Sequence, residues 1–191
     1  MKFFSFVLAA AALSFSCAQA QTMQPTASTA LSNNNTFSAA ASFAPPVGVL
    51  FAICGSATKV IHLIGVNFSG TDTTSSTITV SMLRTSTAPS AGTVLPNVSW
   101  DTNNSAPTAT VQYYTAAPTP GTSLGALRVF DLSLPSGTTA TGTQGAITVQ
   151  PSPFGSPVAL RGTNQCVEFY TASSTTGVTI QVSQIWYETA Y

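Results

Sequence analysis

Apolar and polar residues alternate in several short segments of this chain. Between Thr77 and Arg84, for example, Ile78, Val80 and Met82 are separated by single polar residues, and the segment from Val178 to Tyr187 repeats the pattern. A period of two places apolar side chains on one face of a β-strand and polar side chains on the other. These segments predict strands whose sheets have one face in a core and one face in solvent.

The segment from Lys59 to Ser69 is the strongest strand candidate. Counting by twos places Ile61 and Leu63 on one face, while the other face carries Val60, His62, Ile64, Val66 and Phe68. Apolar residues on both faces predict a central strand of a sandwich. The run from Val47 to Cys54 is similar, and the turn residues 55–57 between the two runs predict a hairpin.

Further strand candidates lie between clusters of Gly, Pro, Ser and Asn, without sustained helical spacing. They cover residues 36–43, 108–115, 126–134, 146–150, 158–161 and 165–171. About nine or ten strands at such intervals predict an all-β protein in which two antiparallel sheets pack face to face. Jelly-roll connections are one arrangement of such a sandwich.

The N-terminus has the pattern of an export signal. Lys2 precedes an apolar run from Phe3 to Phe15, and residues 18–20 form a small-x-small cleavage site. We therefore expect residues 1–20 to be a signal peptide, 21–35 a flexible polar leader and 36–191 a single β-sandwich domain. The alternatives are a membrane-spanning helix, for which the run is too short, and a lipoprotein anchor at Cys17, which lacks the residues of a lipobox before it.

The composition narrows the class of function. Of the 191 residues only 5% are charged and 44% are hydrophobic, and five Lys and Arg balance five Asp and Glu. This balance leaves no basic surface for nucleic acid. No later apolar run is long enough to span a bilayer, so we expect no membrane insertion after cleavage. Sheet edges with so few charges are weakly protected against pairing, which favours protein partners or self-assembly.

Two cysteines, Cys54 and Cys166, remain after the predicted cleavage. An even pair in an oxidising compartment predicts a disulfide with a single connectivity. The alternative is two buried thiols that pack as small hydrophobic groups, and the sequence leaves both open.

Residues for catalysis are sparse. The chain has one histidine, His62, in its most hydrophobic strand, where a half-buried or interior hydrogen-bonded role is expected, and it has no G-x-S-x-G motif. Asp131 and Glu168 lie in predicted strands and have Arg128 and Arg161 as candidate ion-pair partners. We therefore expect structural carboxylates instead of the acid-base pair of a glycosidase, no catalytic residues and no cofactor.

No metal site is predicted either. Zinc requires several His, Cys, Asp or Glu ligands at close spacing, and no such group occurs in the sequence. The loop 101–105 has oxygen donors at alternate positions, but Ala106 and Gln112 stand where a calcium loop needs Gly and Glu. An Asx-type turn is the expected structure of this loop.

Aromatic residues supply the remaining candidates for ligand contact. Trp100, Tyr113 and Tyr114 could stack on a sugar, although aromatic residues in strands mostly fill cores. The neighbours Tyr113 and Tyr114 must point to opposite faces of a strand, so we expect one of them to be exposed.

Five short segments occur in a fixed order along the chain: residues 41–45, 55–59, 101–104 with 109–111, 114–119 and 160–163. Together they resemble a family of small β-rich proteins encoded among the structural genes of tailed phages and prophages. The resemblance covers about residues 36–191. It implies a virion-associated or assembly role with no catalytic residues to carry over.

These observations converge on a non-enzymatic protein that acts through a charge-poor surface. The expected role is structural or interactive, with the protein secreted, displayed on the cell surface or, as the resemblance implies, part of a virion. Phage structural proteins normally assemble in the cytoplasm, so the export signal departs from the family pattern. The alternative function is a secreted carbohydrate-binding or adhesive module that contacts a glycan through exposed aromatic residues.

Overall fold

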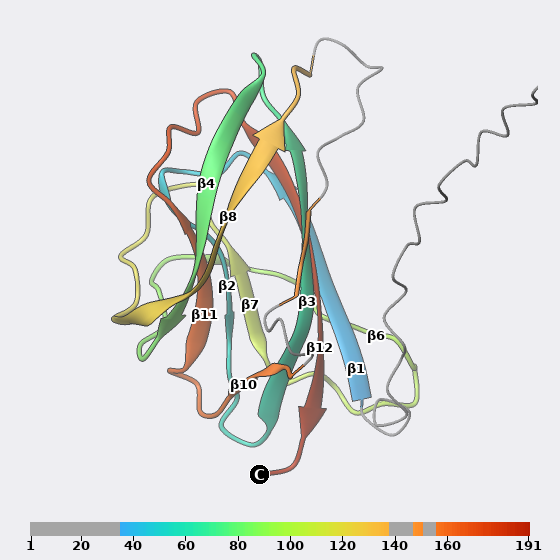
Figure 1. Cartoon of the computed structure of the whole chain (residues 1–191). Helices are drawn as coiled ribbons and strands as arrows, with labels where there is room; N and C mark the ends of the chain where they lie inside the picture. Colours follow the sequence, from blue (N-terminus) through green and yellow to red (C-terminus); the bar gives the residue numbers. More distant parts are fainter. Residues whose placement is uncertain (1–34, 138–146, 151–155) are drawn as a thin grey trace, which may run out of the picture. The chain divides into compact units, whose positions relative to one another are not determined.

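The computed structural model describes residues 35–137, 147–150 and 156–191, which form two antiparallel β-sheets packed face to face (Figure 1). Sheet A contains β1 (Asn35–Phe43), β3 (Val60–Thr71), β6 (Val98–Ser99), β9 (Ile147–Val149), β10 (Val158–Leu160) and β12 (Thr179–Thr189). Sheet B contains β2 (Gly48–Cys54), β4 (Ser76–Thr85), β5 (Thr93–Val94), β7 (Thr110–Tyr113), β8 (Ser123–Leu134) and β11 (Cys166–Thr171). These ranges contain no helix, and hence none that could span a membrane. The predicted two-sheet sandwich is confirmed.

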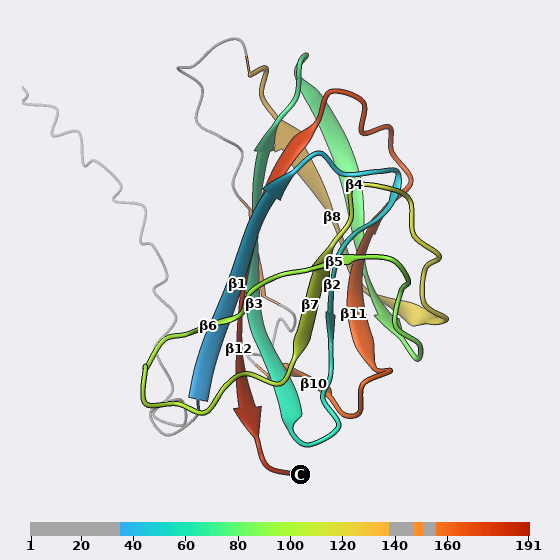
Figure 2. The same ribbon diagram turned by 180° about the vertical axis from the view of Figure 1, so that it is seen from behind.

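The strand order is that of a jelly roll. β1 pairs with β12, β2 with β11, β3 with both β9 and β10, and β4 with β8, so the first and second parts of the chain run together as a double ribbon. The ribbon is folded so that β12 also pairs with β3, and β11 with β4. The first four strands, β1 to β4, therefore alternate between the two sheets. Figure 2 shows the later crossing from β5 to β6 on the other side of the molecule.

The predicted hairpin between residues 47–54 and 59–69 is wrong. β2 lies in sheet B and β3 in sheet A, so the turn between them carries the chain from one sheet to the other. Turn residues indicate that the chain reverses, but they do not determine which strand becomes the neighbour. That choice depends on pairing with β11 and β12, which lie more than a hundred residues further along the chain.

Apolar side chains from both sheets fill the space between them. The largest fully buried ones include Phe37 and Trp186 from sheet A and Phe51 and Phe169 from sheet B. Aromatic pairs bridge the sheets, since Phe68 of β3 contacts Phe169 with ring centroids 5.0 Å apart. This core fixes both sheets, so side chains on their outer faces are held in defined rows.

The predicted faces of β3 are wrong for half of the strand. Val66 and Phe68 lie in the core with Ile61 and Leu63, whereas His62 is only half-buried. The register between β3 and β12 shifts so that Leu63 and then Gly65 face successive residues of β12, leaving Ile64 as the extra residue of a bulge. One extra residue reverses the inward and outward positions beyond it, so counting by twos fails there.

The other strand predictions hold more closely. Each predicted segment contains a strand, and the expected alternation in β12 is confirmed by buried Ile180 and Val182 beside exposed Thr179 and Gln181. The structure adds two strands of two residues each, β5 and β6. The predicted signal peptide (1–20) and nearly all of the predicted leader (21–35) lie outside the described residues.

Candidate functional site

A shallow groove runs over the outer face of sheet A. Strands β1, β12 and β3 are neighbours there, and their outward side chains form cross-strand rows because the pairing is in register around this point. One row consists of Ala40, Ser183 and Asn67, and the next of Ser42, Gln181 and Ser69. We call these six residues the sheet A groove. Small side chains along its floor leave it open to solvent.

The sheet A groove is electrically neutral and presents hydrogen-bonding groups. Its polar members are three serine hydroxyls and two side-chain amides. The Ser69 hydroxyl donates to Gln181 Oε1 at 3.4 Å, which leaves the amide nitrogen of Gln181 free of hydrogen bonds among the described residues. Such groups can donate to and accept from a polar uncharged ligand, and none of them carries a charge that would neutralise an ion.

An aromatic pair lies on the same face, two rows further along β12. The rings of His62 and Tyr187 stack with centroids 4.5 Å apart and planes at 9°. His62 Nε2 also hydrogen-bonds with the Thr189 hydroxyl at 3.0 Å, so the half-buried, hydrogen-bonded role expected for this histidine is confirmed. Partial burial and, to a smaller extent, the charge of Arg161 lower the pKa of His62, which favours its neutral form.

Trp100 stands at the edge of this face and is 65% exposed. Trp100 follows β6 directly in the chain, and its backbone N–H donates to Thr36 O at 3.0 Å. Thr36 is in turn the register partner of Tyr187. The order across the sheet is therefore Trp100, Thr36, Tyr187 and His62.

The three aromatic residues proposed for ligand contact do not come together. Tyr113 is half-buried and packs against Phe43 of the core at 5.0 Å. Tyr114, at 1% exposure, lies on the opposite side of sheet B in a cluster with Val49 and Ala52. The expectation that one of the two tyrosines would be exposed is wrong, because Tyr113 packs against the core and the chain at Gly92 lies against the ring of Tyr114.

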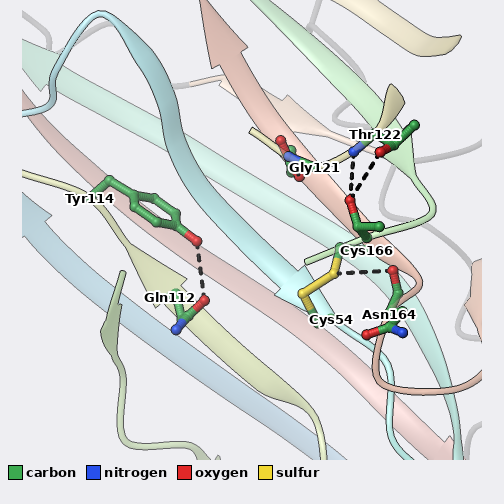
Figure 3. Close-up of a disulfide and its surroundings, with 9 residues drawn as sticks. Cys54, Gln112, Tyr114, Gly121, Thr122, Asn164 and Cys166 are labelled. Carbon is green, nitrogen blue, oxygen red and sulfur yellow. Dashed lines mark hydrogen bonds between the residues drawn. A yellow bond between two sulfur atoms is a disulfide. The ribbon is translucent and has the colours of Figure 1, made fainter. Parts of the chain in front are cut away.

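Residues 115–122, which we call the strap, cover part of the outer face of sheet B. The strap is held by residues 86–90, since Ser90 N donates to Thr119 O at 3.1 Å and Thr122 N to the Thr87 hydroxyl at 2.7 Å. Figure 3 shows Gly121 and Thr122 of the strap near the disulfide between Cys54 and Cys166. These cysteines are register partners in β2 and β11, which resolves the two alternatives in favour of the bond.

Glu168 is buried beneath the strap. Its Oε1 accepts a hydrogen bond from Gly121 N at 2.9 Å, whereas its Oε2 and the Thr85 hydroxyl are buried without a hydrogen-bond partner in the described ranges. A Cβ at position 121 would overlap both Thr87 O and Glu168 Oε1, so only glycine allows the strap this close. Burial raises the pKa of Glu168, and the Gly121 N–H and the neighbouring Thr85 hydroxyl oppose this in part.

The carboxylates serve local structure. Asp131 accepts from the Thr79 hydroxyl at 2.7 Å, and Arg128 donates to Gln150 O, so the expected pairing of Asp131 or Glu168 with Arg128 or Arg161 is wrong. Glycosidase chemistry requires two carboxyl groups facing one another across a cleft. Asp131 is exposed, whereas Glu168 lies under the strap.

Two further carboxylates hold loops in place. Glu188 accepts from Thr108 N at 2.8 Å, from Ala109 N at 3.1 Å and from Trp186 Nε1 at 3.2 Å, and its second oxygen accepts from the Thr108 hydroxyl. A hydrogen bond from Ser76 is the main cause that lowers the pKa of Asp72. Glu188 thus joins the start of β7 to β12, and Asp72 stabilises the turn before β4.

The loop at Asp101 is the Asx turn that the sequence predicts. Asp101 Oδ1 accepts from Asn103 N at 2.9 Å, and Asp101 O from Asn104 N at 3.0 Å. Over the part of the chain that the structure describes, no three His, Cys, Asp or Glu side chains are placed to hold a metal ion.

The free edge of sheet B is a second feature that the sequence does not reveal. β8 pairs with β4 on one side and, among the residues that the structure describes, is the last strand of the sheet on the other. Leu124, Leu127 and Val129 of β8 are 65%, 43% and 56% exposed. The two leucines fall at register shifts between β4 and β8, which turn them out of the regular alternation. The sequence analysis predicts a strand over residues 126–134, and only the exposure of β8 in the structure reveals this apolar edge.

Comparison with protein-family models, curated proteins and solved structures finds no match for this chain. The resemblance to phage-encoded structural proteins therefore stays a prediction. The geometry of the chain offers three features to explain: the sheet A groove, the strap over Glu168 and the apolar edge at β8.

Proposed function

We propose that this protein is an exported, non-enzymatic structural protein that assembles through its surface, on a cell surface or in a virion. The disulfide supports an extracytoplasmic location, because such bonds persist in oxidising compartments. The hydrogen bonding of the carboxylates to nearby backbone and hydroxyl groups supports a role without catalysis. The single observation that carries the assembly role is the β8 edge.

β8 differs from every other edge strand of the described sheets. It is 12 residues long, whereas β5 and β6 have two residues each and β9 and β10 three each. Natural sheets commonly protect their edges by keeping the edge strands short or by placing charges on them. β8 is long and carries only Arg128 and Asp131 as charged residues. No described strand pairs with its outer side, so within the described ranges its outer backbone groups are available to another strand.

The occupant that we propose for this edge is β8 of a second copy. Two antiparallel β8 strands related by a two-fold axis would join their B sheets into one continuous sheet, and closed two-fold dimers are the commonest oligomers. An axis at Val129 places the two Val129 side chains opposite one another on the same face. The exposed leucines would then be covered at the rim of the contact. Their burial adds to the contact area, which must reach about 1,000 Å² in a stable interface.

Light scattering coupled to size-exclusion chromatography tests the proposal on protein exported by cells that express the full chain. We expect a dimer whose population rises with protein concentration. The Val129→Lys variant should be monomeric, because the two lysine side chains would repel one another across the two-fold axis. Val94→Lys is the matched control, since Val94 is 61% exposed but lies in the two-residue edge strand β5.

A wild-type protein that stays monomeric at the highest soluble concentration contradicts the proposal. So does a dimer that survives Val129→Lys and dissociates with Val94→Lys.

A further inference from the structure

We propose that the sheet A groove binds a neutral saccharide chain. This site is separate from the β8 edge, which lies in the other sheet, so the inference does not depend on the assembly proposed above. It also uses different residues from the aromatic set singled out in the sequence, of which only Trp100 lies near the groove.

The first argument is the chemistry of the lining. Asn67 and Gln181 project from adjacent strands onto the same face, one row apart, and each amide offers both a donor and an acceptor. Neighbouring hydroxyls of a sugar also donate and accept, so one amide can bond two of them. No hydrogen bond joins the Asn67 side chain to any described residue. Within the described part of the chain, its amide can therefore bond a ligand without breaking a contact.

The second argument is the absence of charged side chains among the outward residues of β1, β12 and β3. The outward residues of β1, β12 and β3 include threonine, serine, alanine, asparagine and glutamine but no Asp, Glu, Lys or Arg. A phosphate or carboxylate ligand would find no cation in the groove, and an ammonium group no anion. A neutral ligand with many hydroxyl groups fits this lining best, because each of its polar groups can be satisfied.

The third argument is the aromatic pair at the end of the groove. Tyr187 lies four residues from Ser183 on β12, or about 13 Å along the strand at the usual rise. This distance exceeds the length of one sugar ring, so a ligand that contacts both places has several rings. The apolar body and polar tip of Tyr187 suit the C–H face of a sugar. Exposed Trp100 lies on the far side of Thr36 from Tyr187. One cross-strand row, Ser38, Ile185 and Gly65, separates the two places, and a chain of several rings would pass over it.

The test is isothermal titration calorimetry with four defined probes. Cellohexaose, laminarihexaose and mannohexaose are the neutral hexasaccharides, and the hexamer of galacturonic acid is the charged one. We expect binding to at least one neutral hexamer and none to the charged hexamer. Asn67→Ala should weaken that binding about tenfold, as the loss of a hydrogen-bonding partner does. Ala40→Tyr should abolish it by filling the groove without removing a polar group.

Asn103→Ala is the matched control, because Asn103 is an exposed asparagine in the loop after Trp100 and should leave affinity unchanged. Thermal melting of each variant verifies that it is folded. Failure of all three neutral hexamers to bind overturns the inference. Binding that is indifferent to both Asn67→Ala and Ala40→Tyr also overturns it. Repeating the titration with the Val129→Lys variant separates this outcome from the oligomeric state.

Discussion

Gln184 points from β12 into the core, between Ala39 of β1 and Val66 of β3. It is fully buried, and neither its Oε1 nor its Nε2 has a hydrogen-bond partner among the described residues. A buried amide without partners costs free energy because water solvates it in the unfolded chain. Gln184 is thus the polar member of a cross-strand row whose neighbours, Ala39 and Val66, are apolar.

We therefore predict that Gln184→Met raises the free energy of unfolding by about 1–3 kcal/mol, because methionine has a similar shape and no group to desolvate. Urea titration measures the change. Gln181→Met on the exposed face of the same strand is the control, with an expected change within about 0.5 kcal/mol. A less stable Gln184→Met protein would show that the amide is satisfied in solution.

Two buried glutamates have opposite surroundings and should respond oppositely to the same substitution. Four donors surround the Glu188 carboxylate, whereas Glu168 has one donor and an unpartnered oxygen. Because burial raises the pKa of Glu168, the folded protein binds its proton more tightly than the unfolded chain does. The contribution of Glu168 to stability is then greatest below the unfolded pKa of about 4.3 and falls as pH rises through the folded value.

We predict that Glu168→Gln removes this fall and makes the protein more stable at neutral pH, because the amide carries no charge to desolvate. Glu188→Gln should lower stability by about 1–3 kcal/mol, since three N–H groups converge on Oε1 and a neutral amide oxygen accepts them less strongly than a carboxylate oxygen does. Thermal melts between pH 4 and 8 compare the two variants. A Glu168→Gln protein with an unchanged pH profile would show that this carboxyl is not the source of the slope.

At the scale of elements, the disulfide joins two adjacent strands and closes a loop of 112 residues between Cys54 and Cys166. In the chain-entropy account, a loop of about 100 residues is worth about 4.7 kcal/mol, and removal of a native bond typically costs 2–5 kcal/mol. Strands β2 and β11 are central in sheet B, so the loss acts on the whole sandwich and not on a frayed end.

We predict that the double variant Cys54→Ala with Cys166→Ala loses about 2–5 kcal/mol of stability and that its unfolding no longer responds to reductant. Guanidinium titration of both proteins, with and without dithiothreitol, tests this. Equal stability of the wild type and the double variant would mean that the pairing between β2 and β11 alone holds the two strands together and that the disulfide adds no stability.

The bulges show how an element can escape prediction. In β3 the extra residue Ile64 moves Val66 and Phe68 into the core, and in β8 register shifts turn Leu124 and Leu127 outward. Each of these residues is apolar, so the sequence signals burial for all of them alike. Which ones are buried depends on the pairing partner, because a bulge exists only relative to the strand opposite it.

At the scale of the whole molecule, low charge links the proposals. Neutral side chains on the outer face of sheet A suit an uncharged ligand, and a sparsely charged β8 leaves the sheet edge unprotected. The jelly-roll topology puts the two features in different sheets, so ligand binding and self-association can occur together. An exported protein would use the β8 edge to assemble and the sheet A groove to contact a glycan.

The sequence by itself determined the all-β class, the positions of the long strands, the pair of cysteines and the scarcity of charge. These follow from local alternation, turn residues and composition, which need no knowledge of neighbours. Only the tertiary structure decided the rest. It paired β2 with β11 and not with β3, covered Glu168 with the strap, and aligned Asn67 and Gln181 in one groove. These features depend on contacts between residues far apart in the chain, and strand register, which sets them, is fixed by the core that all strands bury together.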